Sequence, residues 1–114
     1  MKDNKRYYWI KLKTDFFNQS EIDFLLAQPN GCEYVVLYQM LCLQTVNQKG
    51  KLGYNFGKIM VPYDIAKIVR DTKYFDEDIV RVGLELFKKL HLIYLEEDAC
   101  LKIADIENIV GSEK

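Results

Sequence analysis

The segment of residues 33–47 is apolar on almost every side of the helix that its periodicity predicts. One helical stripe of this segment contains Tyr34, Leu37, Tyr38, Leu41 and Thr45. Most of the remaining positions are apolar as well, namely Val35, Val36, Met40, Cys42 and Leu43. Such a helix must be surrounded by other elements, and it falls short of the roughly 18 apolar residues that a membrane span needs. We therefore predict a central core helix around which the remaining elements pack.

The length and composition predict one folded domain over residues 1–114. A chain of 114 residues that is 49% hydrophobic can close one modest core, and its eight Tyr and six Phe argue against disorder. The three cysteines are odd in number and have no C-x-x-C spacing, and the polar N-terminus leads into no apolar signal segment. Both features favour a soluble cytoplasmic protein.

The N-terminal part of the chain predicts a strand followed by a helix. Residues 7–13 alternate in the manner of a half-buried strand. The inward face holds Tyr8, Ile10 and Leu12, and the outward face holds Tyr7, Trp9, Lys11 and Lys13. Asn18 and Glu21 have the spacing of a capping box, which predicts a helix that starts there and ends near Gln28. Phe17 and Ile22 are placed for a hydrophobic staple at its entry.

The middle of the chain predicts a loop and two consecutive helices. Glycines and lysines dominate residues 48–61, which we interpret as a loop with a short strand at residues 59–61. Pro62 suits the first position of a helix over residues 62–70, and a polar turn leads to a longer helix over residues 76–90. The predicted inward residues are Ile65, Ala66, Ile68 and Val69 in the first helix and Ile79, Gly83, Leu86, Phe87 and Leu90 in the second.

The end of the chain predicts a hairpin and a short helix. Two β-prone runs in residues 92–103 flank an acidic tip at residues 96–99, and residues 104–110 predict the helix. A buried helix, a helix-turn-helix pair and a hairpin follow one another in the order of a winged helix-turn-helix. We therefore predict an α+β, mainly α fold: a winged helix-turn-helix with an extra N-terminal strand and helix.

Four segments of the chain resemble one protein family. They are KRYYWIKLKTDFFNQSEIDFLL, EYVVLYQMLCLQ, KGKLGYNF and VGLELFKKLHLIYLEE. Together they resemble the N-terminal domain of phage replisome organisers, which is similar to the N-terminal region of the bacterial primosomal protein DnaD. The resemblance implies a role in opening a phage replication origin and in loading the helicase and primase machinery. It also implies that the domain is the N-terminal part of a longer replication protein.

Few residues could support catalysis or cofactor binding. We interpret His91, the only histidine, as a structural residue at the end of a helix, and no phosphate-binding loop motif occurs. Cys32, Cys42 and Cys100 are widely spaced, which favours packing over metal binding. The carboxylates of residues 76–78 suit a helix N-terminus without a bound cation. We predict a protein that is not an enzyme and has no metal or cofactor.

The charges disfavour DNA binding through the second helix of the pair. Its start carries three carboxylates, and residues 93–107 contain five acids and one base, a net charge of −4. These groups would repel phosphates. Positive charge gathers around the first helix of the pair and at residues 1–13, where five bases and one acid give +4. The candidate DNA-binding residues are Lys67, Arg70, Lys73, Arg81, Lys11 and Lys13.

Two functions of different class remain open. In the first, the domain binds the DNA of the phage origin, mainly through phosphates. In the second, it is a homo-oligomerisation or replisome-docking module without DNA binding of its own, and Tyr7 and Trp9 on an exposed strand face form the contact. Helicase or a helicase loader would be the docked protein, and no membrane contact is expected. A winged-helix transcription regulator is a further alternative.

Overall fold

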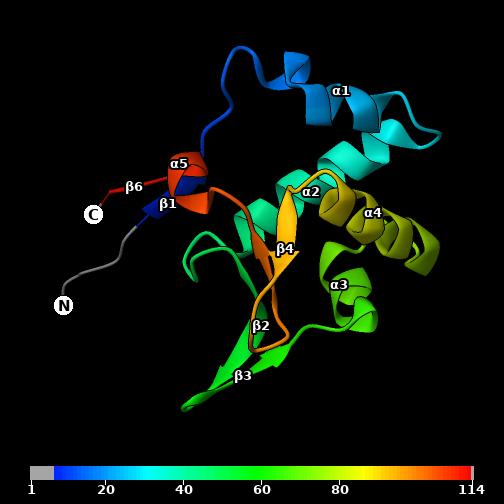
Figure 1. The fold of residues 1–114 in the computed structure, drawn as a ribbon. Helices are drawn as coiled ribbons and strands as arrows, with labels where there is room; N and C mark the ends of the chain where they lie inside the picture. Colours follow the sequence, from blue (N-terminus) through cyan, green and yellow to red (C-terminus); the bar gives the residue numbers. More distant parts are fainter. Residues whose placement is uncertain (1–6, 114) are drawn as a thin grey trace.

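Helix α2 (Gly31–Gln44) lies at the centre of the computed structural model, which describes residues 7–113 (Figure 1). The whole predicted stripe is buried, and Val35 and Cys42 on its flank are buried as well. Val36 and Leu43 lie on the side that reaches solvent. The predicted central core helix is therefore confirmed, although it begins and ends somewhat earlier than residues 33–47.

The early start of α2 follows from the turn before it. Asn30 adopts a left-handed φ of 63°, and the Gly31 N–H donates a hydrogen bond to the Gln28 carbonyl at 2.9 Å. A Cβ atom at Gly31 would lie 2.6 Å from the Leu26 carbonyl oxygen, closer than real Cβ atoms come. Glycine therefore lets the chain turn sharply from one helix into the next.

Helix α1 (Ser20–Leu26) packs against α2 and is preceded by a 3-10 turn, η1 (Phe16–Asn18). Its fully buried residues are Ile22 and Leu25. The predicted capping box is wrong, because Asn18 belongs to the 3-10 turn and Gln19 occupies the N-cap position without a side-chain hydrogen bond. Phe17 is exposed and packs edge-to-face against Phe16, with ring centroids 5.0 Å apart.

Four strands form one antiparallel sheet in the order β3-β2-β5-β4 (Figure 1). They are β2 (Lys51–Phe56), β3 (Ile59–Pro62), β4 (Ile93–Leu95) and β5 (Leu101–Ile103). The β4–β5 hairpin with its acidic tip confirms the prediction. The short strand predicted at residues 59–61 is confirmed as β3, but residues 51–56 do not belong to a loop, because β2 pairs with β3 as a second hairpin with Tyr54 opposite Val61 and Phe56 opposite Ile59.

The two glycines of this second hairpin have different places: Gly53 lies inside the sheet and Gly57 lies in the turn, so they do not mark one continuous loop. A Cβ atom at Gly53 would lie 2.7 Å from Cys100 Sγ, so glycine lets β2 approach the chain beside β5 closely. Gly57 takes a φ of 61° in the tight turn to β3. The alternation of Leu52, Tyr54 and Phe56 was the strand signal that the surrounding glycines and lysines obscured.

Helix α3 (Ile65–Thr72) is the first helix of the predicted pair. Pro62 is the last residue of β3 and does not start this helix. Asp64 is the N-cap instead, and its carboxylate accepts a hydrogen bond from the Lys67 N–H at 2.8 Å. Ile68 is buried, whereas Ala66 is exposed, contrary to the prediction, because it lies about half a turn away from Ile68 around the helix.

Helix α4 (Glu77–Lys89) starts as predicted, and the Asp76 carboxylate accepts a hydrogen bond from the Ile79 N–H at 2.9 Å. The helix packs against α2, where the Phe87 and Tyr38 rings meet with centroids 5.6 Å apart. A Cβ atom at Gly83 would lie 2.9 Å from Leu37 Cδ2, so glycine sets the close approach of the two helices. The buried residues of α4 are Ile79, Val80, Gly83, Leu84 and Phe87, and Leu86 and Leu90 are partly buried.

Strands β1 (Tyr7–Ile10) and β6 (Val110–Glu113) form a separate two-stranded antiparallel sheet. Strand β6 follows the short helix α5 (Ile106–Ile109) and takes the place of the last part of the helix predicted over residues 104–110. A Cβ atom at Gly111 would collide with the indole of Trp9, so this glycine makes room for the ring on the neighbouring strand.

Strand β1 is shorter and more exposed than the predicted strand over residues 7–13. Tyr8 and Leu12, which were predicted to face inward, are 41% and 59% exposed. The reason is that the two-stranded sheet stands at the side of the molecule and does not cover the core (Figure 1). Ile10, the third residue that was predicted to face inward, packs against the core.

The fold over residues 7–113 is α+β, with five α-helices and two antiparallel sheets. Its core joins α1, α2 and α4 to the four-stranded sheet, which contributes Leu52, Ile93 and Ile103. Among the described residues, no helix is long and apolar enough to cross a membrane.

We expect Leu41→Ala to lower the free energy of unfolding by about 2–5 kcal/mol, as measured by chemical denaturation. Leu41 is fully buried in α2, so the substitution removes packed methyl groups and leaves a cavity. The control is Leu43→Ala in the same helix, where Leu43 is 50% exposed and the loss should stay below about 1 kcal/mol. Equal losses in both variants would contradict the central position of α2.

Candidate nucleic-acid interface

The start of α4 is acidic, and the one arginine near it, Arg81, already forms ion pairs within the helix. Arg81 Nη1 donates a hydrogen bond to Asp78 Oδ1 at 3.2 Å, and Arg81 Nη2 donates to Glu77. Together with Asp76, these groups are three acids and one base, a net charge of −2. A helix-turn-helix would turn this end of the helix toward DNA. Arg81 was a predicted DNA-binding residue, but its guanidinium is paired with two carboxylates of its own helix.

Helix α3 and its C-cap carry two cations that remain available, Arg70 and Lys73. Lys67 donates a hydrogen bond to Asp71, and this bond raises the pKa of Lys67. Arg70 and Lys73 are exposed, and no ion pair within residues 7–113 includes either of them. Both can therefore contact a phosphate without first breaking an ion pair of their own.

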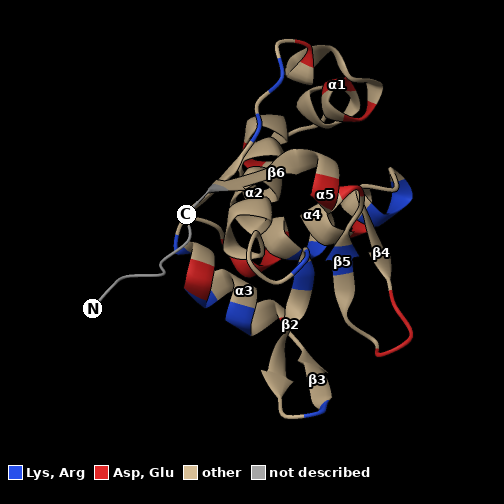
Figure 2. Ribbon diagram, turned by 90° about the vertical axis from the view of Figure 1, so that its left-hand side faces the viewer, with Lys and Arg blue, Asp and Glu red and all other residues tan. Residues whose placement is uncertain are grey.

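The acidic tip of the β4–β5 hairpin is partly neutralised by a lysine from β2. Lys51 Nζ donates a hydrogen bond to Asp98 Oδ2 at 2.5 Å and lies 3.1 Å from Glu96 Oε1. The Cys100 N–H also donates to Asp98, at 3.0 Å. The Lys51 ammonium and this N–H hold the pKa of Asp98 below its usual value. Figure 2 shows this acidic tip beside the basic tip of the β2–β3 hairpin.

The β2–β3 hairpin is a surface that the sequence analysis missed. Its exposed large apolar residues are Tyr54, Phe56, Ile59 and Val61. Lys67 Nζ lies 5.1 Å from the centroid of the Tyr54 ring and 4.9 Å from that of the Tyr63 ring. This contact joins the hairpin to α3, so the apolar face and the cations of α3 are neighbours.

A match to a known protein family covers almost the whole chain. The model of the N-terminal phage replisome organiser family matches residues 9–114. The chain belongs to this family. Comparisons with curated proteins and with solved structures gave no significant match. The family resemblance of the four sequence segments is confirmed, and membership gives the replisome organiser domain a role related to phage DNA replication.

The remaining predicted DNA-binding lysines of the replisome organiser domain lie away from α3. Lys11 and Lys13 follow β1, which Figure 1 shows on the opposite side of the molecule from α3. The six predicted residues thus fall into two separate groups. The lysines and arginine of residues 1–6, which contribute to the predicted N-terminal charge, lie outside the described residues.

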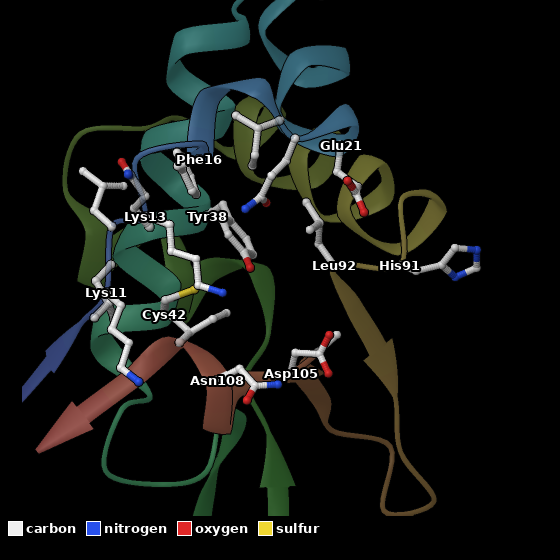
Figure 3. Close-up of a pocket in the computed structure, with 17 residues that line it drawn as sticks. Lys11, Lys13, Phe16, Glu21, Tyr38, Cys42, His91, Leu92, Asp105 and Asn108 are labelled. Carbon is white, nitrogen blue, oxygen red and sulfur yellow. The ribbon is translucent and has the colours of Figure 1, made fainter.

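Lys11 and Lys13 line a cavity of about 460 Å³ between the segment after β1, α2 and α5. Figure 3 shows the Tyr38 hydroxyl pointing into this cavity, close to the Cys42 thiol. Burial raises the pKa of Tyr38, and it raises the pKa of Cys42 to about 12. Neither group ionises at neutral pH, so the cavity contains no activated nucleophile from this pair.

The other reactive side chains of the replisome organiser domain are dispersed. His91 follows Leu90, the C-cap of α4, and it is exposed and contributes to the lining of the cavity (Figure 3). Cys42 and Cys100 are buried as predicted, but Cys32 is exposed because it lies about half a turn from the buried Tyr34. Within the described part of the chain, no group of three His, Cys, Asp or Glu residues could hold a metal ion.

The structure places Tyr7 and Trp9, the predicted protein-interface residues, on β1 with 58% and 42% of their surfaces exposed. One edge of β1 is occupied by β6, and the pairing continues where the Lys11 N–H donates to the Ile109 carbonyl at 2.7 Å. A partner at this strand would therefore meet its exposed face or its other edge.

Replacing Lys51 by Met should raise the pKa of Asp98 toward the usual carboxyl value, because the ammonium that stabilises the carboxylate is gone. Carbon-detected NMR titration of the side-chain carboxyl measures this change. Since the pKa of folded Asp98 is lowered, its stabilising contribution is present at neutral pH and is lost as pH falls through that lowered value.

The matched control for this titration is Lys49→Met, which removes the same charge from an exposed residue in the neighbouring turn. It should leave the Asp98 titration unchanged. An equal shift in both variants would mean that overall charge sets this pKa, and not the contact with Lys51.

Proposed function

We propose that this replisome organiser domain is a non-enzymatic replication initiation module with a winged-helix fold, which binds duplex DNA weakly through phosphates. The order of the elements supports the winged-helix interpretation. Helices α2, α3 and α4 are followed by the β4–β5 hairpin, and β2 completes the sheet order β2-β5-β4. In this interpretation, β4–β5 is the wing and α4 is the second helix of the helix-turn-helix.

The observation that carries the proposal is the contrast between the two helices of the pair. Arg70 on α3 and Lys73 at its C-cap have no ion-pair partner among residues 7–113, whereas the start of α4 has a net charge of −2. Phosphates are therefore attracted to α3, and base reading by α4 is disfavoured. A dissociation constant in the range of about 10⁻⁴ to 10⁻⁶ M and a steep dependence on salt are expected for such binding.

A second candidate function is a docking or self-association surface on β1. The observation that favours it is the exposure of Tyr7, Tyr8 and Trp9, three consecutive aromatic residues. Aromatic side chains are enriched at protein interfaces. A second copy of the domain, a helicase or a helicase loader would be the partner, in the cytoplasm and without a membrane. Both functions can coexist, since β1 and α3 lie on different sides of the molecule (Figure 1).

Arg70→Ala combined with Lys73→Ala should weaken binding to every duplex sequence to a similar degree. Titrations over a range of salt concentrations should give a logarithmic slope that is smaller by about two, one for each lost phosphate contact. The matched control, Lys11→Ala with Lys13→Ala, removes two charges from the other side of the domain and should change binding much less. A larger loss in the control would move the site to the segment after β1.

Glu77→Lys combined with Asp78→Lys should strengthen duplex binding, because it reverses the charge at the start of α4 and releases Arg81. The gain should disappear at high salt, since it is electrostatic. Thermal unfolding of the variant checks that α4 tolerates lysines near the positive end of its dipole. A nanomolar, origin-specific complex that is lost on mutation of residues 76–81 would instead make α4 a reader of bases.

A further inference from the structure

The β2–β3 hairpin projects from the body of the domain and exposes an apolar face (Figures 1 and 2). Tyr54 pairs with Val61 and Phe56 pairs with Ile59, and residues directly opposite in an antiparallel pair lie on the same face. The exposed fractions are 36% for Tyr54, 61% for Phe56, 65% for Ile59 and 40% for Val61. A contiguous apolar surface of this kind on a projecting hairpin marks an interaction site.

Three aromatic rings run along this hairpin toward α3. The Phe56 and Tyr54 centroids are 5.8 Å apart at an interplanar angle of 36°, and the Tyr54 and Tyr63 centroids are 5.0 Å apart at 74°. Lys67 Nζ lies within about 5 Å of the Tyr54 and Tyr63 centroids, at 5.1 and 4.9 Å. Lys58 sits in the turn at the other end of the row. The row of rings therefore has a cation at each end, and the one next to α3, Lys67, is also paired with Asp71.

The surroundings of the rings are basic in a chain that is slightly acidic. Residues 57–74 contain four bases and two acids, a net charge of +2, while the whole chain carries −1. The rest of the chain therefore has a net charge of −3. A polyanion is attracted to this local excess of positive charge, as it is to that of residues 1–13.

The free edge of β3 is poorly suited to pairing with a second copy of the chain. The Tyr63 N–H donates to the Leu52 carbonyl at 3.1 Å, so the backbone groups of Tyr63 point toward β2. Backbone groups of successive residues in a strand point in opposite directions, so those of Met60 and Pro62 point toward the outer edge of the sheet. Pro62 has no N–H, and proline at an outer edge position blunts strand addition. The apolar face thus needs a partner that covers rings and does not extend the sheet.

We propose that Tyr54, Phe56 and Tyr63 form a stacking platform for single-stranded nucleic acid, with Lys58 and Lys67 beside its phosphates. Every base has a π-face that can stack on an aromatic ring, and unpaired bases are accessible, whereas those of a duplex already stack on one another. The inference rests on the proposed DNA-binding function and extends it: α3 attracts phosphates of either form, and the hairpin retains the unpaired strand.

The test compares Phe56→Ala with Ile59→Ala in the 114-residue chain. Both residues are on the same exposed face at similar exposure, but only Phe56 offers a ring. Fluorescence anisotropy with labelled oligo-dT, oligo-U and a duplex of equal length should show that Phe56→Ala weakens binding to both single strands about tenfold. Its duplex affinity and melting temperature should match those of the wild type, and Ile59→Ala should bind all three nearly normally.

The outcomes separate this inference from the duplex function. A Phe56→Ala effect no larger than that of Ile59→Ala overturns the stacking platform and leaves the role of Arg70 and Lys73 intact. Single-strand binding that depends on Phe56, with no duplex binding at all, overturns the duplex function and supports the platform. Light scattering provides a third test, because it measures whether the chain is a dimer. If the wild type is a dimer, both substitutions make it monomeric and the affinity for oligo-dT is unchanged, the face binds a second copy of the chain and the inference is overturned.

Discussion

The burial of α2 is the constraint on which the other elements depend. A helix that is apolar over most of its circumference needs neighbours on several sides, and α1, α4 and the root of the four-stranded sheet provide them. Two glycines set how close these neighbours come: Gly31 where α1 turns into α2, and Gly83 where α4 meets Leu37. Helix α3 packs against α4 in turn, so the close contact at Gly83 also bears on where α3 lies relative to the core.

The cations of the replisome organiser domain fall into two classes, those held in ion pairs and those without an ion pair among the described residues. Lys51 and Arg81 each lie between two carboxylates, and their main effect is on the local structure. Ion pairs at this level of exposure contribute little free energy individually. Arg70, Lys73 and Lys58 have no such partner within residues 7–113. With a net charge of −1, the domain attracts a polyanion through local excesses of positive charge such as this one.

The elements that the sequence predicted are those specified by nearby residues. The stripe of α2, the acidic start of α4 and the β4–β5 hairpin all follow from spacings of a few residues, and all are present. Some misses are local, namely the capping box at Asn18 and the helix start at Pro62, whereas the larger ones depend on distant partners. Gly53 belongs to a strand because Cys100, far along the chain, packs against it, and β6 exists because β1 lies beside it.

The candidate site was predictable to a smaller degree, for the same reason. Composition and spacing identified Lys67, Arg70 and Lys73 as a basic group, and the structure has them on α3 and at its C-cap. Sequence alone could not separate them from Lys11 and Lys13, because that separation depends on where β1 packs. It also could not place the Tyr54 and Tyr63 rings around Lys67, since this contact requires the pairing of β2 with β3.

The two hairpins of the four-stranded sheet end in tips of opposite charge, with Lys58 on β2–β3 and three carboxylates between β4 and β5 (Figure 2). This arrangement is an electric dipole fixed to a rigid sheet. In the field of a nucleic acid strand, such a dipole experiences a torque before any contact forms. These two tips by themselves favour an approach with the β2–β3 side leading and the β4–β5 tip trailing. Their contribution to the orientation on a strand requires no recognition of base sequence.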